Sequence, residues 1–424
     1  MKHPSMAGAI TKFLLHLHPR KIEPKAIVFT RTFGLGGIAA LLFVILFVTG
    51  MMLRFAYVPS GAGAYDSIVR LQDEVIFGNL LRNFHYWSAM LLVVVSFLHL
   101  VRVFYSQAIY FERRKNWLYG LLLMFFVVSS NFTGYLLPWD QLSFWAVTIM
   151  TNMLSYIPLV GNSLAGMIRG GDAVTEETLL RFYNFHTGLL PLLMVFFMAI
   201  HFWLVRKAKG VAIPSSEKAE KVDTSPNLVY KEVLTALIVV FVLLLFSFFV
   251  DAPLLDKAKP LVSPNPSKAP WYFMGFQELL MHMHPAFASF LIPLLVIEFF
   301  IIVPFLPYRS INKGVWFYSE NGKRISLISA IATVGFTLFL ILVDDLLLDF
   351  NHWFPGTPVL ITEGVFPVLM YFVPVGGFLY YLRKKLKADR MELVLASGTI
   401  ILVAYLVMTL VGSLLRGEGM QLIF

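Results

Sequence analysis

Hydrophobic residues in this chain gather in nine long segments that are separated by polar stretches. Each segment is close to the ~20 residues that a helix needs to cross the apolar core of a bilayer. The segments are 34–53, 84–106, 117–137, 183–205, 233–250, 287–307, 325–344, 363–382 and 392–413. The eighth is the most interrupted, because Pro367, Pro374, Gly376 and Gly377 lie within it. The pattern predicts an all-α polytopic membrane protein.

Composition supports this fold class and excludes several chemistries. Of the 424 residues, 58% are hydrophobic and 14% are charged, and the mean hydropathy is +0.75. Such a ratio is not that of a soluble protein. The chain has no cysteine. This excludes disulfides, iron–sulfur clusters held by this chain, and haem attached through a thioether.

The basic residues are unevenly divided between the two sides of the predicted membrane. If the N-terminus faces the cytoplasm, that side holds 25 of the 34 Lys and Arg but 9 of the 25 acidic residues. The other side holds 9 basic and 15 acidic residues, and Glu298 lies inside a segment. Basic residues favour the cytoplasmic side. The net charge of +9 therefore reflects topology, and we expect no nucleic acid as a partner.

Composition also marks an N-terminal segment and one internal boundary. Residues 1–33 combine basic residues with a modest apolar stripe, which predicts an amphipathic helix on the membrane surface. Residues 34–207 carry the first four segments, and the polar, Ser- and Pro-containing stretch 208–232 is a natural boundary. The remaining five apolar segments follow this boundary.

Four histidines lie in the second and fourth apolar segments. His85 and His99 are 14 residues apart, and His186 and His201 are 15 apart. Both spacings are close to four whole helical turns, so each pair shares one helix face, separated by a rise of ~21 Å. A single intramembrane histidine often only bonds a neighbouring helix. Two matching pairs on helices of the same direction instead predict two metal centres, and ligation by imidazole alone suits haem iron better than zinc.

Glycines repeat this spacing, and arginines flank the histidines. Gly36 and Gly50, and likewise Gly120 and Gly134, are 14 residues apart on the first and third segments. Either pair alone is ordinary for a membrane helix, but the shared spacing favours close packing around a haem. Arginines near the histidines are candidate partners for haem propionates, although interfacial anchoring explains Arg206 equally well. These arginines are Arg82, Arg102 and Arg206.

Two long loops on the outer side, 138–182 and 251–286, are unusually apolar. Apolar loops over the mouth of a bundle commonly line a binding site. The first reads LPWDQLSFWAVTIMTNMLSYIPLVG from Leu137 onward, which predicts short helices along the outer surface. The second contains PNPSKAPWYFMGFQELLMHMHP. We expect both loops to fold back onto the bundle.

These motifs together resemble cytochrome b of the bc-type quinol oxidoreductases. The resemblance rests on the histidine and glycine spacings, on GYLLPWDQ at 134–141, TLLRFYNFH at 178–186 and WYF at 271–273. The second histidine spacing and the PWDQ sequence are closer to the chloroplast and cyanobacterial type. The likeness is almost continuous over 31–209, and 233–345 is similar to that type's separate subunit IV, here fused into one chain. The resemblance therefore implies a second domain over 233–345. Residues 346–424 lie beyond the family pattern, and we expect them to form an additional C-terminal transmembrane region.

The resemblance implies a four-helix bundle with two non-covalent haem b groups, plus about five further transmembrane helices. The outer haem would have axial ligands His85 and His186, and the inner haem His99 and His201. It also implies oxidation of a quinol, such as menaquinol, at the outer face. One electron would pass to a Rieske-type iron–sulfur protein or a cytochrome c subunit, and the other through both haems to a quinone at the inner face. A dimeric complex is implied.

The chain departs from the family pattern in two places. Where the family's outer loop reads Pro-Glu-Trp-Tyr, with a glutamate that accepts a quinol proton, this chain has Ala269, Pro270, Trp271 and Tyr272. Glu278, two helical turns beyond Pro270, is our candidate replacement, with Tyr272 and His282 as further site residues. Gly34 also stands where the chloroplast type has a cysteine linked to an extra haem, so we expect no such haem.

We therefore predict a quinol oxidoreductase subunit in a bacterial or archaeal cytoplasmic membrane, with the N-terminus in the cytoplasm. Two alternatives remain open from the sequence. One is a di-haem anchor that relays electrons between the quinone pool and a peripheral redox enzyme, which needs neither apolar outer loop. The other is a proton-coupled transporter with intramembrane histidines and no haem.

Overall fold

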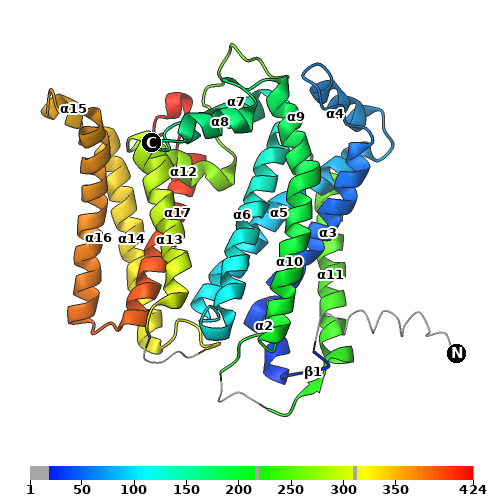
Figure 1. The fold of residues 1–424 in the computed structure, drawn as a ribbon, viewed down its shortest axis with the longest axis vertical. Helices are drawn as coiled ribbons and strands as arrows, with labels where there is room; N and C mark the ends of the chain where they lie inside the picture. Colours follow the sequence, from blue (N-terminus) through cyan, green and yellow to red (C-terminus); the bar gives the residue numbers. More distant parts are fainter. Residues whose placement is uncertain (1–18, 215–218, 309–312, 424) are drawn as a thin grey trace. The chain divides into compact units, whose positions relative to one another are not determined.

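The computed structural model describes residues 19–214, 219–308 and 313–423, and these form an almost entirely helical protein (Figure 1). Within these ranges, nine helices are long and apolar enough to cross a membrane. They are Leu35–Arg54, Gly78–Tyr105, Phe111–Leu136, Glu176–Lys207, Thr224–Phe249, Phe287–Phe305, Glu320–Leu347, Leu360–Lys385 and Arg390–Leu415. The predicted fold class is confirmed. Several helices extend beyond the apolar segments because their polar ends continue the same backbone hydrogen bonding.

Three of the nine helices contain a π-helical turn within the described residues. These turns are η3 (Phe185–Leu189), η5 (Phe287–Leu291) and η7 (Leu360–Val365). In each case a proline follows two residues after the turn, at positions 191, 293 and 367. Proline has no N–H and its ring clashes with the carbonyl four residues earlier, so the preceding turn widens.

The eighth segment shows how such a proline is accommodated. It is one helix, α16 (Phe366–Lys385), although Pro374 lies inside it and η7 precedes it. The carbonyl of Glu363 lies four residues before Pro367 and cannot accept a helical hydrogen bond from it. It accepts one from the backbone N–H of His284 at 2.7 Å instead. The prolines thus leave the crossing intact and make a carbonyl available for tertiary bonding.

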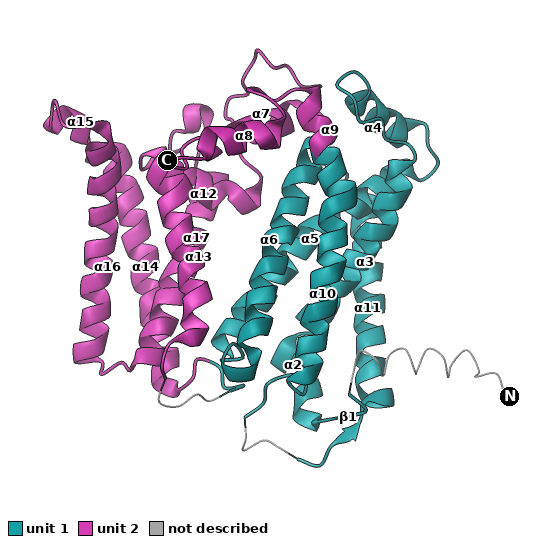
Figure 2. Cartoon of the chain, in the orientation of Figure 1, with its two compact units in different colours: residues 1–138, 182–254, 310–316 teal, residues 139–181, 255–309, 317–424 magenta. Residues whose placement is uncertain are grey.

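Contacts divide the chain into two compact units, shown in different colours in Figure 2. Unit 1 comprises residues 1–138, 182–254 and 310–316. Its elements are β1 (Lys21–Ile22), η1 (Pro24–Ile27), α2 (Phe29–Thr32), α3 (Leu35–Arg54), α4 (Ala64–Asp73), α5 (Gly78–Tyr105), η2 (Phe111–Arg113), α6 (Arg114–Leu136), η3, α10 (Leu190–Lys207), β2 (Val222–Asp223) and α11 (Thr224–Phe249). In this unit α3 packs against α5, α5 against α6, and α6 against α10. These four packed helices form the bundle that holds the histidines.

The N-terminal segment of unit 1 is partly described. Residues 1–18, where most of the expected amphipathic surface helix would lie, are outside the described residues. From residue 19 onward the chain forms β1, η1 and α2. Strand β1 pairs antiparallel with β2, with Lys21 opposite Asp223. This ladder attaches the start of the chain to the polar stretch before α11.

Unit 2 comprises residues 139–181, 255–309 and 317–424. Its elements are α7 (Gln141–Leu154), α8 (Gly161–Arg169), most of α9 (Glu176–Asn184), α12 (Trp271–Met281), η5, α13 (Ile292–Ile302), η6 (Val303–Phe305), α14 (Glu320–Leu347), α15 (Phe350–Trp353), η7, α16, α17 (Arg390–Leu414) and η8 (Glu418–Met420). Helix α17 packs against α12, α14 and α16 and is the most buried of the nine spans. It begins with a capping box in which Asp389 and Glu392 bond each other's backbone N–H. It is therefore the structural centre of this unit.

The two units group the helices differently from the ranges expected from the sequence and its resemblance to the family. Helix α11, the first span of the expected domain 233–345, packs against α3 and α5 in unit 1. Helix α17, in the expected additional region 346–424, provides the core of unit 2 together with α14, through Ile341, Val407 and Val411. Composition marks where the chain changes character, whereas packing depends on which apolar faces meet. The five ranges remain a prediction.

Candidate functional site

The four histidines of unit 1 form two facing pairs. His85 and His99 lie on α5, His201 lies on α10, and His186 lies in the π-turn η3 that leads into α10. The ring centres of His85 and His186 are 6.3 Å apart, and those of His99 and His201 are 6.5 Å apart. The pairs are those expected from the sequence, with one partner from each helix.

The π-turn explains why the second spacing is one residue longer than the first. A π-turn holds one more residue than an α-helical turn, so it shifts the following side chains back by one position. Because η3 begins just before His186, the 15 residues to His201 carry the same rotation as about 14 residues of regular α-helix. The proline at position 191 that causes this turn therefore also keeps both histidines on one face.

The separations within the pairs fit ligation of one metal ion by two imidazoles. A metal-bound imidazole nitrogen lies about 2.0 Å from the ion and the ring centre about 1.1 Å farther, so two opposed rings have centres about 6.2 Å apart. The observed values of 6.3 and 6.5 Å agree with this distance. Within the described residues, no cysteine or carboxylate ligand completes either pair. The donor set, imidazole on both sides, is that of a six-coordinate haem iron.

Neighbouring groups fix the orientation of the His85 and His186 imidazoles. Thr49 Oγ1 lies 2.8 Å from His85 Nδ1, and the carbonyl oxygen of Ser130 lies 2.9 Å from His186 Nδ1. A hydrogen bond at Nδ1 selects the tautomer that leaves Nε2 to bind a metal, and it increases the basicity of the ligand. We did not predict these roles of Thr49 and Ser130 from the sequence. Thr49 lies immediately before Gly50, which is the signal that marks it.

Each of the four glycines faces one of the four imidazoles. A Cβ added at Gly36 would lie 3.3 Å from His99, one at Gly50 would lie 3.2 Å from His85, and one at Gly120 would lie 3.6 Å from His201. At Gly134 the distance to His186 Cε1 would be 2.5 Å. The shared spacing thus reflects four close approaches between a helix backbone and a histidine ring. Glycine permits them because it has no side chain.

The three arginines have different surroundings. The buried guanidinium of Arg82 donates to the carbonyls of Ala252 and Pro253 at 2.8 and 2.7 Å. Arg102 is also buried and donates to the carbonyl of Arg31 at 3.1 Å. Arg206 is exposed at the end of α10. Arg82 and Arg102 therefore hold adjacent chain segments in place, and a role toward haem propionates remains a prediction for all three.

The two apolar outer loops meet within unit 2, and both contain helices, as expected from their composition. Loop 138–182 forms α7 and α8, and loop 251–286 forms α12 (Figure 1). Asp140 caps α7 and also accepts a hydrogen bond from the backbone N–H of Leu255 at 3.1 Å. The backbone N–H of Gln141 donates to the carbonyl of Asp256 at 2.8 Å. The aspartate and glutamine of the PWDQ sequence thus tie the two loops together.

The predicted outer-site residues lie on or next to α12. Tyr272 is buried, and the hydroxyl of Tyr405 on α17 donates to its carbonyl oxygen. The Glu278 side chain is fully buried, with 0% exposure. His282 follows the last turn of the helix, and its Nε2 lies 3.2 Å from Glu278 Oε1. Glu278 and His282 therefore share one face, as their four-residue spacing predicts.

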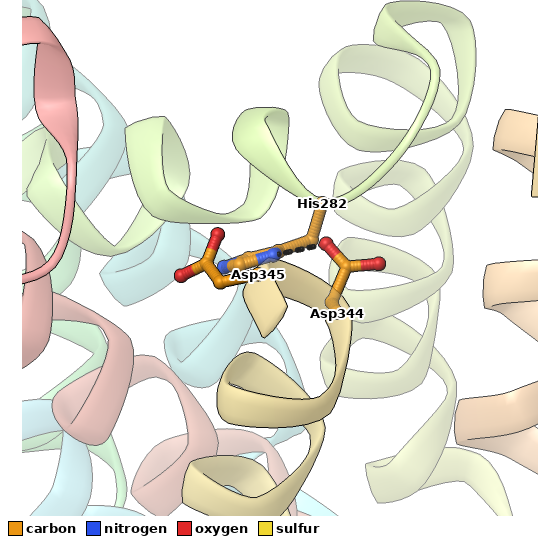
Figure 3. A group of neighbouring side chains, drawn as sticks. All are labelled: His282, Asp344 and Asp345. Atoms are coloured by element: carbon orange, nitrogen blue, oxygen red, sulfur yellow. Dashed lines mark hydrogen bonds and ion pairs between the residues drawn. The ribbon is translucent and has the colours of Figure 1, made fainter. Parts of the chain in front are cut away.

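The structure adds three charged residues to Glu278 and His282. His282 Nδ1 lies 2.6 Å from Asp344 Oδ2 on α14. Arg416, just beyond α17, donates through Nη2 to Glu278 Oε1 at 2.5 Å and through Nη1 to Asp345 Oδ2 at 2.8 Å. Figure 3 shows His282 with Asp344 and Asp345, and the dashed line marks the bond to Asp344. We call these five residues the outer charge cluster.

The cluster shifts the pKa values of the two candidate proton acceptors in opposite directions. Burial alone would raise the pKa of the Glu278 carboxyl, but hydrogen bonds and positive charge from His282 and Arg416 outweigh it and lower this pKa. Burial alone would lower the pKa of the His282 imidazole, but Asp344 and Glu278 raise it to about 9. At neutral pH the cluster therefore holds a glutamate anion beside an imidazolium.

Three members of the cluster have the composition of a cation site, because ligand atoms of His282, Asp344 and Asp345 lie within 4.8 Å of one another. The guanidinium of Arg416 already neutralises Asp345 at 2.8 Å and is itself almost fully buried. A fixed positive charge at this distance competes with a metal ion for the same carboxylate. The arrangement therefore suits an ion-pair and hydrogen-bond network better than a metal site.

The sequence signal for Arg416 was its position on the acidic side of the membrane. It is one of the few basic residues expected outside, and it lies directly after the last apolar segment. Asp344 and Asp345 are adjacent acids at the outer end of the seventh segment. Nothing in the sequence indicated that α12, α14 and α17 would bring these residues together, because their packing depends on long-range contacts.

Comparison with known proteins agrees with the histidine geometry. A sequence model of the family described as Cytochrome b/b6/petB matches residues 21–209. A cytochrome b6 from Synechococcus sp. (strain JA-3-3Ab) is 40% identical over 205 residues, which cover 48% of this chain and 94% of that protein. A cytochrome b6 from Gloeobacter violaceus (strain ATCC 29082 / PCC 7421) is 43% identical over 180 residues, covering 42% and 83%.

A solved structure extends the fold comparison to most of the chain. A chain of a structure described as a hyperthermophilic respiratory Complex III matches with a TM-score of 0.67 and 23% identity. The match covers 88% of this chain and 97% of the other. The paired histidines lie within the residues matched by the family model. The match to the cytochrome b6 from Synechococcus covers almost the whole length of that relative. This protein is a multi-pass membrane protein that belongs to the cytochrome b/b6 family, whose members bind haem b.

Proposed function

We propose that this protein is the cytochrome b subunit of a membrane quinol oxidoreductase and holds two non-covalent b haems. His85 and His186 would hold the outer haem, and His99 and His201 the inner one. The observation that carries the proposal is the near-identical separation of 6.3 and 6.5 Å in two imidazole pairs on the same two helical segments. Membership of the cytochrome b/b6 family supports it.

Bound at both pairs, haem b would supply one-electron chemistry at two depths of the bundle. The chain's own residues would hold and orient the groups. Thr49 and the Ser130 carbonyl direct the outer imidazoles through their Nδ1 atoms. Arg82 fixes the chain at Ala252 and Pro253, where the second outer loop begins. This anchoring joins the outer end of α5 to the loop that we assign to the quinol site.

We place the quinol site at the outer ends of α7, α8 and α12. Quinol oxidation releases two protons, and Pro270 cannot accept one where the family pattern has a glutamate. Glu278 lies on the helix that follows Pro270, and His282 lies directly after that helix; both are titratable and largely buried. We propose that they receive a quinol proton, and that Tyr272 helps shape the site from the start of the helix.

The proposed partners and location follow the family. We propose a Rieske-type iron–sulfur protein or a cytochrome c subunit as electron acceptor, a dimeric complex, and quinone as the final acceptor at the inner face. The predominance of basic residues on one side supports a cytoplasmic membrane with the N-terminus in the cytoplasm. The relative described as part of a respiratory Complex III supports a multi-subunit assembly.

The alternative of a simple di-haem anchor is less well supported. A simple anchor needs only the histidine bundle. This chain also has two long loops that form α7, α8 and α12, and hydrogen bonds of Asp140 and Gln141 connect these loops. Glu278, on α12 of the second loop, is fully buried. Such a construction is consistent with a site for a reaction that releases protons.

The experiment is stopped-flow mixing of the purified complex with a short-chain menaquinol, followed by the haem absorption. The wild type should show rapid reduction of haem. Glu278→Gln keeps the shape but removes the basicity, so reduction should slow by at least ~10-fold with haem content unchanged. A normal rate in Glu278→Gln with a collapse in His282→Gln would assign the acceptor to His282. If quinol does not reduce the wild-type haems, the proposed function is wrong.

A further inference from the structure

In the outer charge cluster, the imidazole of His282 connects the buried carboxylate of Glu278 to the more exposed carboxylate of Asp344. The Glu278 side chain has 0% exposure, the His282 side chain 12% and the Asp344 side chain 29%. The connecting distances are 3.2 Å from Glu278 Oε1 to Nε2 and 2.6 Å from Nδ1 to Asp344 Oδ2. Both lie in the range of direct hydrogen bonds. Each ring nitrogen of His282 therefore faces a different carboxylate, and exposure increases along the series.

Arg416 keeps the buried end of this series in place. Its Nε lies 3.1 Å from both carboxylate oxygens of Glu278, and its Nη2 lies 2.5 Å from Oε1. Its Nη1 is 2.8 Å from Asp345, and it also donates to the carbonyl of Met420. A planar guanidinium that binds two carboxylates at once restricts their positions more than a lysine does. Arg416 thus joins α12 to α14 through the end of α17.

Resting on the quinol oxidation proposed above, we propose that Glu278, His282 and Asp344 form a proton-conducting relay from the buried face of α12 to the outer surface. Arg416 acts as a positioning residue that keeps the Glu278 carboxylate ionised and aimed at His282. The relay assigns two additional residues, Asp344 and Arg416, to the quinol reaction. It also gives a function to the final helix of the chain.

The relay would transfer one proton at a time through the His282 imidazole. His282 in its imidazolium form gives its Nδ1 proton to Asp344, which releases it to the outer water. A half-turn of the neutral ring brings the deprotonated nitrogen to Glu278. The quinol O–H bond breaks, its electron pair stays on the quinol oxygen, and the proton forms an O–H bond on Glu278. Glu278 then passes this proton to the ring, which restores the imidazolium. A second passage through the same cycle removes the second quinol proton, so that the loss of two protons and of two electrons to the acceptors proposed above leaves a neutral quinone.

The charges around the imidazole make this sequence pH-dependent. The groups that face His282 are Glu278 on α12, Asp344 and Asp345 on α14, and Arg416 at the end of α17. The cation of Arg416 lowers the pKa of Glu278 and so keeps it able to accept a proton at neutral pH. Without this cation the carboxyl would be protonated at higher pH. The acid limb of the rate profile would then move toward neutral pH.

The first test compares Asp344→Asn with Glu418→Gln as a charge-matched control. Glu418 is exposed and lies two residues beyond Arg416. Asp344→Asn should slow quinol-driven haem reduction by at least ~10-fold. Millimolar formate should restore much of the lost rate, because it can carry protons away from His282 in place of Asp344. Glu418→Gln should keep the wild-type rate. Equal rates in both variants, or slowing that formate does not relieve, would overturn the relay.

The second test concerns Arg416 and uses pH profiles of the same reaction. Arg416→Gln should shift the acid limb to higher pH, and Arg416→Lys should restore part of the shift because it keeps the charge but loses the fork. A purely structural role would lower the rate equally at every pH, which would overturn the assignment. If quinol reduces the wild-type haems but the Asp344→Asn test does not give its expected result, the relay fails while the proposed function stands. If quinol does not reduce wild-type haems, the proposed function itself fails.

Discussion

Replacing Gly134 by alanine should displace His186 and cost the protein its outer haem. The added Cβ would lie 2.5 Å from His186 Cε1, about 0.9 Å closer than an ordinary contact of 3.4 Å. The ring cannot simply move away, because its Nδ1 is held 2.9 Å from the Ser130 carbonyl. A metal–ligand distance tolerates only about 0.2 Å, and overpacking of this kind typically costs about 1–3 kcal/mol.

Gly120→Ala is the matched control for this prediction. Its Cβ would lie 3.6 Å from His201, an ordinary van der Waals contact, so both haems should remain. The assay is a pyridine haemochrome count together with redox titration of the purified protein. We expect about one haem per chain in Gly134→Ala and about two in Gly120→Ala. Full haem content with unchanged potentials in Gly134→Ala, or greater loss in Gly120→Ala, would refute the reasoning.

Two further outcomes follow from named contacts. Thr49→Val removes the hydroxyl that lies 2.8 Å from His85 Nδ1. The outer haem should then dissociate ~10- to 100-fold more readily in acid titration, with little change at the inner haem. An equal effect on both haems would contradict this prediction. The pKa of His282 is about 9 against an ordinary 6.5, so its ion pairs contribute stability fully below pH 6.5 that is lost as pH rises through 9, at most roughly 3 kcal/mol. Thermal denaturation midpoints should therefore fall over this window in the wild type and stay flatter in His282→Gln, and parallel curves would argue against it.

The sequence predicted the spans and the histidine pairs because both depend on local periodicity. Apolar segments of membrane length have few alternatives to a helix, since backbone polar groups in a bilayer must bond internally. The pairing of His85 with His186 followed from helix direction and spacing alone. The glycine positions followed from the same repeat, although the structure gives them an imidazole to face, which periodicity could not identify.

The outer charge cluster could be predicted only in part. Glu278 and His282 share a helix face at four-residue spacing, and this local relation was visible in the sequence. Arg416 lies 138 residues after Glu278 in the sequence, and Asp344 lies 62 residues after His282. Such contacts depend on how α12, α14 and α17 pack, and an apolar segment carries little information about which neighbour it will choose. The π-turn before Pro191 was likewise readable only as an unexplained extra residue between two histidines.

Haem counting and redox titration of His186→Leu and His201→Leu beside the wild type test whether two histidine pairs hold two haems. We predict two acid-extractable haems per wild-type chain and one in each variant. The component lost from the titration should be a different one in each variant. One haem per wild-type chain, a covalently attached haem, or loss of the same component from both variants while the other remains bound would contradict it.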